Sequence, residues 1–129
     1  MVQNVRHLTL TIAIAGLFLQ GCARHDSKRA QDKAEKALET VLDAWTRGEP
    51  ADKYADPNQP VNATDPDWKA GFRLLSFLTL ESKPVADGPN HFQCRVSLSL
   101  QARNGARTER DVDYDVRLGD KTVIARASH

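Results

Sequence analysis

Two strictly alternating segments near the end of the chain constrain the fold more than any other feature. Residues 91–101 place an apolar side chain at every second position, and residues 107–118 do so from Val112 onward, with a mostly polar side chain between. The apolar positions are Phe92, Cys94, Val96, Leu98 and Leu100, then Val112, Tyr114, Val116 and Leu118. Because successive side chains of a strand point to opposite faces, both segments are predicted strands with one face on a core and the other in water.

The Asn104-Gly105 pair between these segments limits how they can pair. A two-residue turn would pair positions whose numbers sum to 209, which sets apolar residues opposite acids. A three-residue loop with Gly105 in the left-handed conformation and a bulge gives a sum of 208 instead, and Cys94 then faces Tyr114. A sum of 210 also keeps the faces apart. The sequence therefore predicts an antiparallel pair with an even sum.

A helix and two further strands complete the expected domain. Apolar residues at helical spacing predict an amphipathic helix over residues 28–47, with Gly48 at its end. The spaced residues are Ala34, Leu38, Val41, Leu42 and Trp45. Residues 71–81 are a predicted strand, buried on both faces or bent by a bulge, and residues 121–127 are the last strand. The expected fold class is α+β, with one N-terminal amphipathic helix packed on a curved four-stranded antiparallel meander.

Residues 50–66 are the expected irregular segment between the helix and the strands. They hold four of the six prolines and few apolar residues. A short helical turn around residues 51–54 is expected to shorten this connection. Asp65 lies in the segment and Asp67 just beyond it, so we expect both carboxylates to be exposed.

The first residues are predicted to form a targeting segment rather than part of the domain. The apolar run Leu8–Leu19 is shorter than the roughly 18–20 residues needed to span a bilayer. A polar start with one arginine, a short apolar run and a small residue before a possible cleavage point are typical of a secretory signal peptide, here residues 1–21. The run ends in Leu19-Gln20-Gly21-Cys22, which resembles the lipobox of bacterial lipoproteins, although Gln20 departs from that pattern.

The lipobox resemblance implies cleavage before Cys22 and attachment of lipid to that cysteine. Residues 22–28 would then be the lipidated cysteine and a polar tether, and residues 29–129 the globular domain. The protein would be anchored at the bacterial cell envelope by lipid, and Ala23 after the cysteine favours the outer membrane in a two-membrane cell. The open alternatives are a signal cleaved elsewhere and an uncleaved anchor, both with Cys22 incidental.

Charge and cysteine usage exclude several classes. Beyond residue 21 the chain carries 17 basic and 17 acidic residues, so it lacks the basic surface of nucleic-acid binders. With Cys22 lipidated, Cys94 is the remaining thiol, no intrachain disulfide can form, and its place among alternating apolar residues predicts a core position.

The search for chemical motifs finds no metal or cofactor site in the sequence. Asp111 to Asp115 imitate the start of a calcium loop, but Val116 and Thr122 stand where that loop needs glycine and glutamate. These acids are therefore predicted to be a solvated strand face. His91 follows a turn and is predicted to be a surface residue, and no phosphate-binding glycine loop or dinucleotide fingerprint occurs.

The order of elements resembles the cystatin-like or NTF2-like shape. The resemblance rests on a helix that ends in Leu42-Asp43-Ala44-Trp45, an intervening segment and long paired closing strands. More narrowly, the stretches VLDAWTRGEP and DPDWKAGFRLLSF are similar to a group of small, uncharacterised envelope lipoproteins. Proteins of this shape include isomerases and hydrolases with a pocket between helix and sheet. The candidate pocket residues here are Trp45, Tyr54, Trp68, Phe77 and Tyr114, with Asp65 and Asp67 at the mouth.

We therefore expect a lipid-anchored envelope protein whose domain is a non-enzymatic binding or interaction module with an unknown envelope protein partner. The alternative is a small-molecule-binding or SnoaL-like enzyme domain that uses the cavity between helix and sheet. A filled core with an exposed apolar patch favours the first hypothesis. A cavity of roughly 300 Å³ or more with a buried acid or histidine favours the second.

Overall fold

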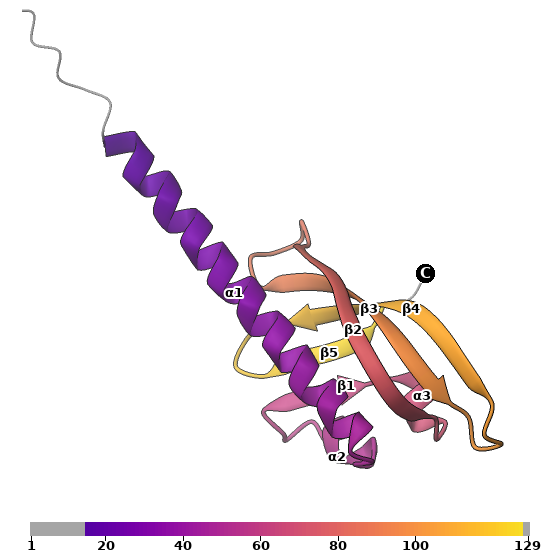
Figure 1. The fold of residues 1–129 in the computed structure, drawn as a ribbon. Helices are drawn as coiled ribbons and strands as arrows, with labels where there is room; N and C mark the ends of the chain where they lie inside the picture. The colour runs from indigo at the N-terminus through magenta and orange to yellow at the C-terminus, as the bar shows by residue number, and fades with distance from the viewer. Residues whose placement is uncertain (1–14, 128–129) are drawn as a thin grey trace, which may run out of the picture.

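The protein is a two-layer α+β structure in which one long helix lies across one face of a mixed sheet (Figure 1). The structure, a computed structural model, describes the backbone of residues 15–127 and the side chains of residues 26–127. Most of the expected signal peptide, residues 1–14, and the side chain of Cys22 lie outside the described part of the chain.

The sheet has five strands, in the order β1-β5-β4-β3-β2. The strands are β1 (Val61–Thr64), β2 (Arg73–Pro84), β3 (His91–Gln101), β4 (Arg107–Arg117) and β5 (Thr122–Arg126). Strand β1 pairs in parallel with β5, and the other neighbours are antiparallel. The expectation of four strands was therefore wrong by one. Strand β1 has only four residues and pairs with β5, about sixty residues later in the chain. Its residues therefore carry almost no local strand pattern, because the pairing depends on the completed sheet.

The predicted pairing of the two alternating segments is confirmed. Cys94 lies opposite Tyr114, and every pair between β3 and β4 sums to 208. Gly105 has a φ of 88°, the left-handed conformation that the three-residue loop requires. The register places the apolar side chains of both strands on the face that α1 covers, with Cys94 0% and Tyr114 1% exposed.

Helix α1 (Ala15–Thr46) is longer than the predicted helix of residues 28–47. Its backbone is helical through residues 22–28, where the sequence predicted a polar tether. No glycine or proline occurs in residues 22–47, so a helix held by packing further along can propagate back without a break. The N-terminal end of α1 extends well beyond the sheet, and residues 26–29 are exposed (Figure 1). No helix in the described part of the chain is both long and apolar enough to cross a membrane.

The predicted apolar face of the helix is confirmed as the centre of the core. Leu38, Leu42 and Trp45 are at most 2% exposed and pack with the inward side chains of β3, β4 and β5. The helix ends at Thr46, and Gly48 takes a φ of 83°, as expected for a glycine that ends a helix. The space between α1 and the sheet is therefore filled by side chains.

The segment expected to be irregular contains three short elements. Helix α2 (Asp52–Ala55) matches the expected helical turn, strand β1 follows it, and helix α3 (Pro66–Lys69) leads into β2. The pairing of β2 with β3 shifts register at two places, so the expectation of a bulge in this segment is confirmed. Leu78 and Leu80 of this edge strand remain 64% and 47% exposed.

Candidate functional site

Two carboxylates that the sequence places in an exposed position are in fact buried. Asp65 is 6% and Asp67 is 8% exposed, so the expectation of exposure was wrong. The cause is local, because Asp65 caps the short helix α3 and Pro66 occupies its first position. The Asp65 Oδ1 atom accepts hydrogen bonds from the backbone N–H of Asp67 at 2.8 Å and of Trp68 at 3.1 Å. This cap turns both acids toward the sheet.

The second oxygen of Asp65 is held by side chains from two strands. Its Oδ2 atom accepts the Tyr114 hydroxyl from β4 at 2.5 Å and the Arg126 Nη2 from β5 at 2.8 Å. With the two backbone bonds, this carboxylate accepts four hydrogen bonds, which is about the number that its lone pairs allow. Asp65 is therefore saturated by protein groups.

Asp67 is fixed in the same way by two arginines. Arg110 Nη1 on β4 lies 3.1 Å from both carboxylate oxygens, and Arg126 Nη1 lies 2.6 Å from Oδ2. We call Asp65, Asp67, Arg110, Tyr114 and Arg126 the Asp65 cluster. The cluster holds two acids and two arginines, so its formal charges cancel.

The protonation of the cluster follows from its burial and its pairing. Burial raises the pKa of Tyr114 above its usual range, and the adjacent Asp65 carboxylate raises it further. Burial alone would lower the pKa of Arg126, but hydrogen bonding, with Asp67 first, outweighs it and the net pKa is raised. Tyr114 therefore stays a hydroxyl that donates to Asp65, and Arg126 stays a cation.

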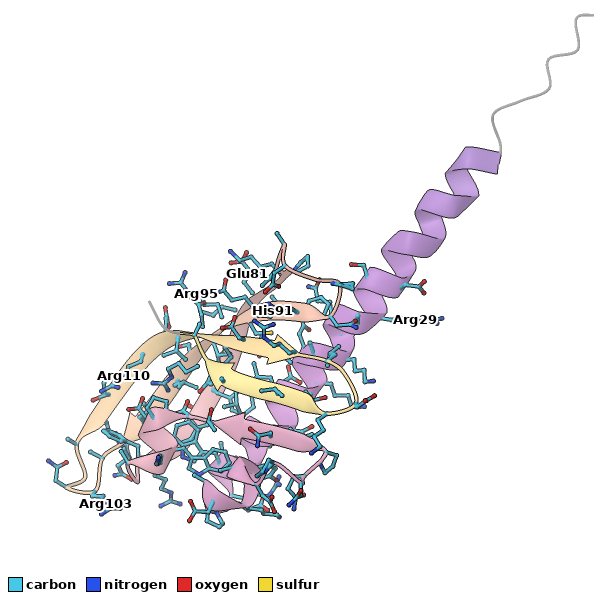
Figure 2. The ribbon with its side chains drawn as sticks, turned by 180° about the vertical axis from the view of Figure 1, so that it is seen from behind. Arg29, Glu81, His91, Arg95, Arg103 and Arg110 are labelled. Carbon is cyan, nitrogen blue, oxygen red and sulfur yellow. The ribbon has the colours of Figure 1, made fainter. Side chains whose placement is uncertain are left out.

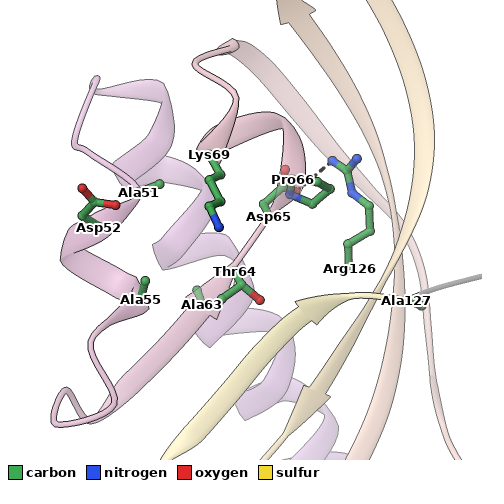
Figure 3. Close-up of a pocket in the computed structure, with 10 residues that line it drawn as sticks. All are labelled: Ala51, Asp52, Ala55, Ala63, Thr64, Asp65, Pro66, Lys69, Arg126 and Ala127. Carbon is green, nitrogen blue, oxygen red and sulfur yellow. Dashed lines mark hydrogen bonds and ion pairs between the residues drawn. The ribbon is translucent and has the colours of Figure 1, made fainter.

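A cleft of about 470 Å³ opens beside the Asp65 cluster at the β1 edge of the sheet (Figure 3). Its walls come from α2, β1, α3 and the end of β5. The lining residues are Ala51, Asp52, Ala55, Ala63, Thr64, Asp65, Pro66, Lys69, Arg126 and Ala127. Alanine methyl groups and a proline ring make most of this surface apolar, with polar groups at a few places, which is the usual composition of a small-molecule site.

Three polar groups of the cleft have no partner within the described part of the chain. The Lys69 ammonium and the Asp52 carboxylate make no ion pair or hydrogen bond there. The Nε of Arg126 is buried and also lacks an acceptor. In Figure 3 the Lys69 side chain lies between Ala51 and Ala55 on one side and Asp65 on the other, while Asp52 is at the far side of the cleft from Arg126.

The candidate pocket residues from the sequence lie outside this cleft. Trp45 and Trp68 stack with their rings 5.4 Å apart, and their indole N–H groups donate to the Phe72 and Glu49 carbonyls. Tyr54 tilts against Trp68 at 5.6 Å. The structure thus brings these three aromatic rings together as packing.

The other two candidates are placed apart from that aromatic group. Phe77 packs on the core from β2, and Tyr114 belongs to the Asp65 cluster. A second depression, of about 370 Å³, is lined by Trp45 and Trp68 and shares Ala51, Asp52 and Lys69 with the first cleft. Neither depression lies between α1 and the middle of the sheet.

His91 differs from its prediction as a surface residue. It is 8% exposed at the start of β3, with Nδ1 2.6 Å from Asp87 Oδ1 and Nε2 3.2 Å from Asp115 Oδ1. Figure 2 shows this histidine from behind the sheet, the side away from α1. The hydrogen bond with His91 lowers the pKa of Asp87. This contact ties the turn after β2 to β4, so we assign it a structural role.

Cys94 is confirmed as a core residue. It is 0% exposed, and burial raises the pKa of its thiol to about 12. The described residues contain no group of three histidine, cysteine or acidic side chains able to hold a metal ion. The chain matches no protein-family model, and no curated protein or solved structure is significantly similar to it.

Proposed function

We propose that this chain is a lipid-anchored protein of the bacterial cell envelope whose α+β domain is a non-enzymatic binding module. Support for the location comes from the sequence, in which Leu19-Gln20-Gly21-Cys22 resembles a lipobox after a short apolar run. Buried acyl chains contribute about 0.8 kcal/mol per CH₂, so two or more chains on Cys22 would anchor the protein stably.

In this proposal helix α1 carries the domain away from the bilayer. Among the described side chains, those of residues 26–29 are exposed and Ala30 is the first that is partly buried. Ala30 lies eight positions after Cys22, which corresponds to about 12 Å of helix. A helical spacer of this length would keep the sheet and its cleft clear of the lipid headgroups.

The single observation that carries the binding role is the cleft of about 470 Å³ beside a saturated pair of acids. A general base needs a free lone pair within reach of a substrate proton. Asp65 already accepts four hydrogen bonds, and Asp67 is held by Arg110 and Arg126. The buried acids therefore provide no free base, and the unpaired carboxylate that lines the cleft, Asp52, is exposed on the side away from Arg126. The cleft thus offers shape and charge without a buried base, which favours binding over catalysis.

We also propose that strands β2 to β5 with α1 are the cystatin-like or NTF2-like part of the fold. Consecutive antiparallel pairing of these strands and the helix across one face support this. Enzymes of this shape use a cavity between helix and sheet, whereas here Trp45 and Leu38 help to fill that space. The alternative of an enzyme in that cavity therefore has less support than a binding role for the cleft at β1.

The location is tested by Cys22→Ser in the full-length protein. We expect the wild type in the membrane fraction and extractable only with detergent, and the variant in the fraction released without detergent. If the variant remains in the membrane to the same extent as the wild type, lipid on Cys22 is not the anchor.

The binding role is tested by blocking the cleft. Ala55 is exposed and lines it, so Ala55→Trp should fill the space without disturbing the core. Ala86→Trp, in the exposed turn after β2, is the matched control. We expect the wild type and Ala86→Trp to retain the same envelope component on affinity purification, and Ala55→Trp to lose it. Equal recovery by all three proteins would place the binding surface elsewhere.

A further inference from the structure

We infer that the cleft at β1 takes a small organic acid, with its carboxylate at Lys69 and its apolar body against the alanine wall. This inference rests on the proposed binding role and adds the chemical class of the ligand. It is carried by the unpaired charge in the cleft, by the donor left over on Arg126 and by the size of the apolar wall.

The charge in the cleft favours an anion at the Asp65 wall. The Asp65 carboxylate is neutralised by Arg126, so this side of the cleft has no free negative charge. The Lys69 ammonium lies across the cleft near that wall and has no partner within the described part of the chain (Figure 3). An ammonium that pairs with no acid in a mostly apolar cleft is a ready partner for one carboxylate.

Arg126 supplies a second reason for an oxygen ligand. Its two terminal nitrogens donate to Asp65 and Asp67, while its Nε is shielded from solvent without an acceptor. A buried donor that lacks an acceptor costs free energy. A ligand oxygen that accepted this N–H would remove that cost, whereas a purely apolar ligand would not.

The apolar part of the cleft sets the body of the ligand. Ala51, Ala55 and Ala63 present methyl groups, and Pro66 presents its ring. A volume of about 470 Å³ is enough for a compact ligand with one charged end. Asp52 lies on the side away from Arg126 and would repel a second carboxylate, so we expect a monoacid (Figure 3).

The test is a titration of the full-length, detergent-solubilised protein with benzoate and with benzamide, its neutral counterpart of similar size. Shifts in ¹H–¹⁵N spectra are followed at the Ala63 and Thr64 amides and at the Arg126 Nε–H, a proton that its burial should protect from exchange. We expect saturable shifts with benzoate, with a dissociation constant of about millimolar, and at least fivefold weaker binding of benzamide.

Two variants separate the charge of Lys69 from the shape of the cleft. Lys69→Met keeps the length of the side chain, and we expect it to weaken benzoate binding about fivefold while benzamide binding stays unchanged. Asp52→Asn is the matched control, because it removes the other unpaired charge of the cleft, and it should bind benzoate at least as well as the wild type.

The outcomes distinguish this inference from the proposed function. Equal affinity for benzoate and benzamide, both lost in Ala55→Trp, would overturn the acid specificity and leave the binding role intact. Benzoate binding that is unaffected by Lys69→Met would also overturn it. If neither probe shifts the cleft resonances and Ala55→Trp retains the same envelope component as the wild type, both proposals fail.

Discussion

Replacement of Arg126 by methionine should be the most damaging single change outside the apolar core. Arg126 donates to Asp65 at 2.8 Å and to Asp67 at 2.6 Å, and its side chain is only 15% exposed. Removing one partner from a buried ion pair costs about 3–5 kcal/mol, because the other charge stays buried without compensation. Arg110 still compensates Asp67, so we expect the lower end, about 3 kcal/mol.

The loss should be visible as a large change in unfolding temperature. For a domain of this size, about 1 kcal/mol shifts the midpoint by roughly 4–8 °C, so Arg126→Met should unfold about 12–24 °C below the wild type. The free energy of unfolding is measured by urea denaturation of the full-length protein, followed by circular dichroism. Arg110→Met is the matched control, because Arg110 is 43% exposed, pairs with Asp67 and otherwise lies over the Phe72 ring, so its loss should cost about 1 kcal/mol or less.

The comparison of these two variants decides whether the Asp65 cluster holds the β1 edge together. If Arg126→Met loses no more than about 1 kcal/mol, or no more than Arg110→Met, the account of a saturated, structural pair of acids is wrong. If Asp65 and Asp67 do not depend on Arg126, their carboxylates could accept a substrate proton, and an enzymatic role for the cleft would gain support.

Three further changes follow from particular contacts. Tyr114→Phe removes the hydroxyl that donates to Asp65 at 2.5 Å and should cost about 1.5–3 kcal/mol in urea denaturation. Gly71→Ala should cost about 1–2 kcal/mol, because Gly71 has a φ of 92° and an added Cβ would lie 2.4 Å from Arg103 Nε, whereas Gly88→Ala meets no neighbour and should be nearly neutral by thermal unfolding. The thiol of Cys94 has a folded pKa of about 12 against a usual 9.0, so between these values the unfolded chain releases this proton and the folded chain keeps it. Stability should therefore fall as pH rises through that window, less steeply in Cys94→Ala, and equal slopes in urea titrations of the two proteins would contradict the assignment.

Much of the fold could be predicted because its strongest signals are local. The alternation around Cys94 and Tyr114 determines which face of each strand is buried, and Gly105 fixes the loop that sets the register. The helical spacing of Leu38 and Trp45 marks the face that packs on those strands. Each of these patterns involves residues that are close in the sequence, so each can be recognised without knowledge of the whole fold.

The candidate site could not be predicted in the same way because it is assembled by distant segments. Strand β1 exists only where β5 offers an edge, and the acids of the Asp65 cluster are buried by Arg126 about sixty residues later. One local signal was available, since Asp65 followed by Pro66 is a typical start of a helix. An aspartate in that position is expected to cap the helix, with its side chain turned back to the backbone N–H groups. The expectation that Asp65 is exposed did not include this cap.

His91 was mispredicted for a similar reason. Its position directly after a turn favours the surface, but Asp87 and Asp115 reach it from the turn after β2 and from β4. A histidine between two carboxylates is favourable only once the hairpin has closed. The sequence spacing of these three residues carries no hint of that contact.

Native mass spectrometry of the full-length protein extracted from membranes is the most direct test of an anchored binding module. We expect the chain from Cys22 onward with added lipid, and for the wild type, but not for Ala55→Trp, a further bound mass. An unprocessed, unlipidated chain would contradict the anchor. A lipidated chain with the same bound mass in both proteins would contradict the cleft as the binding site.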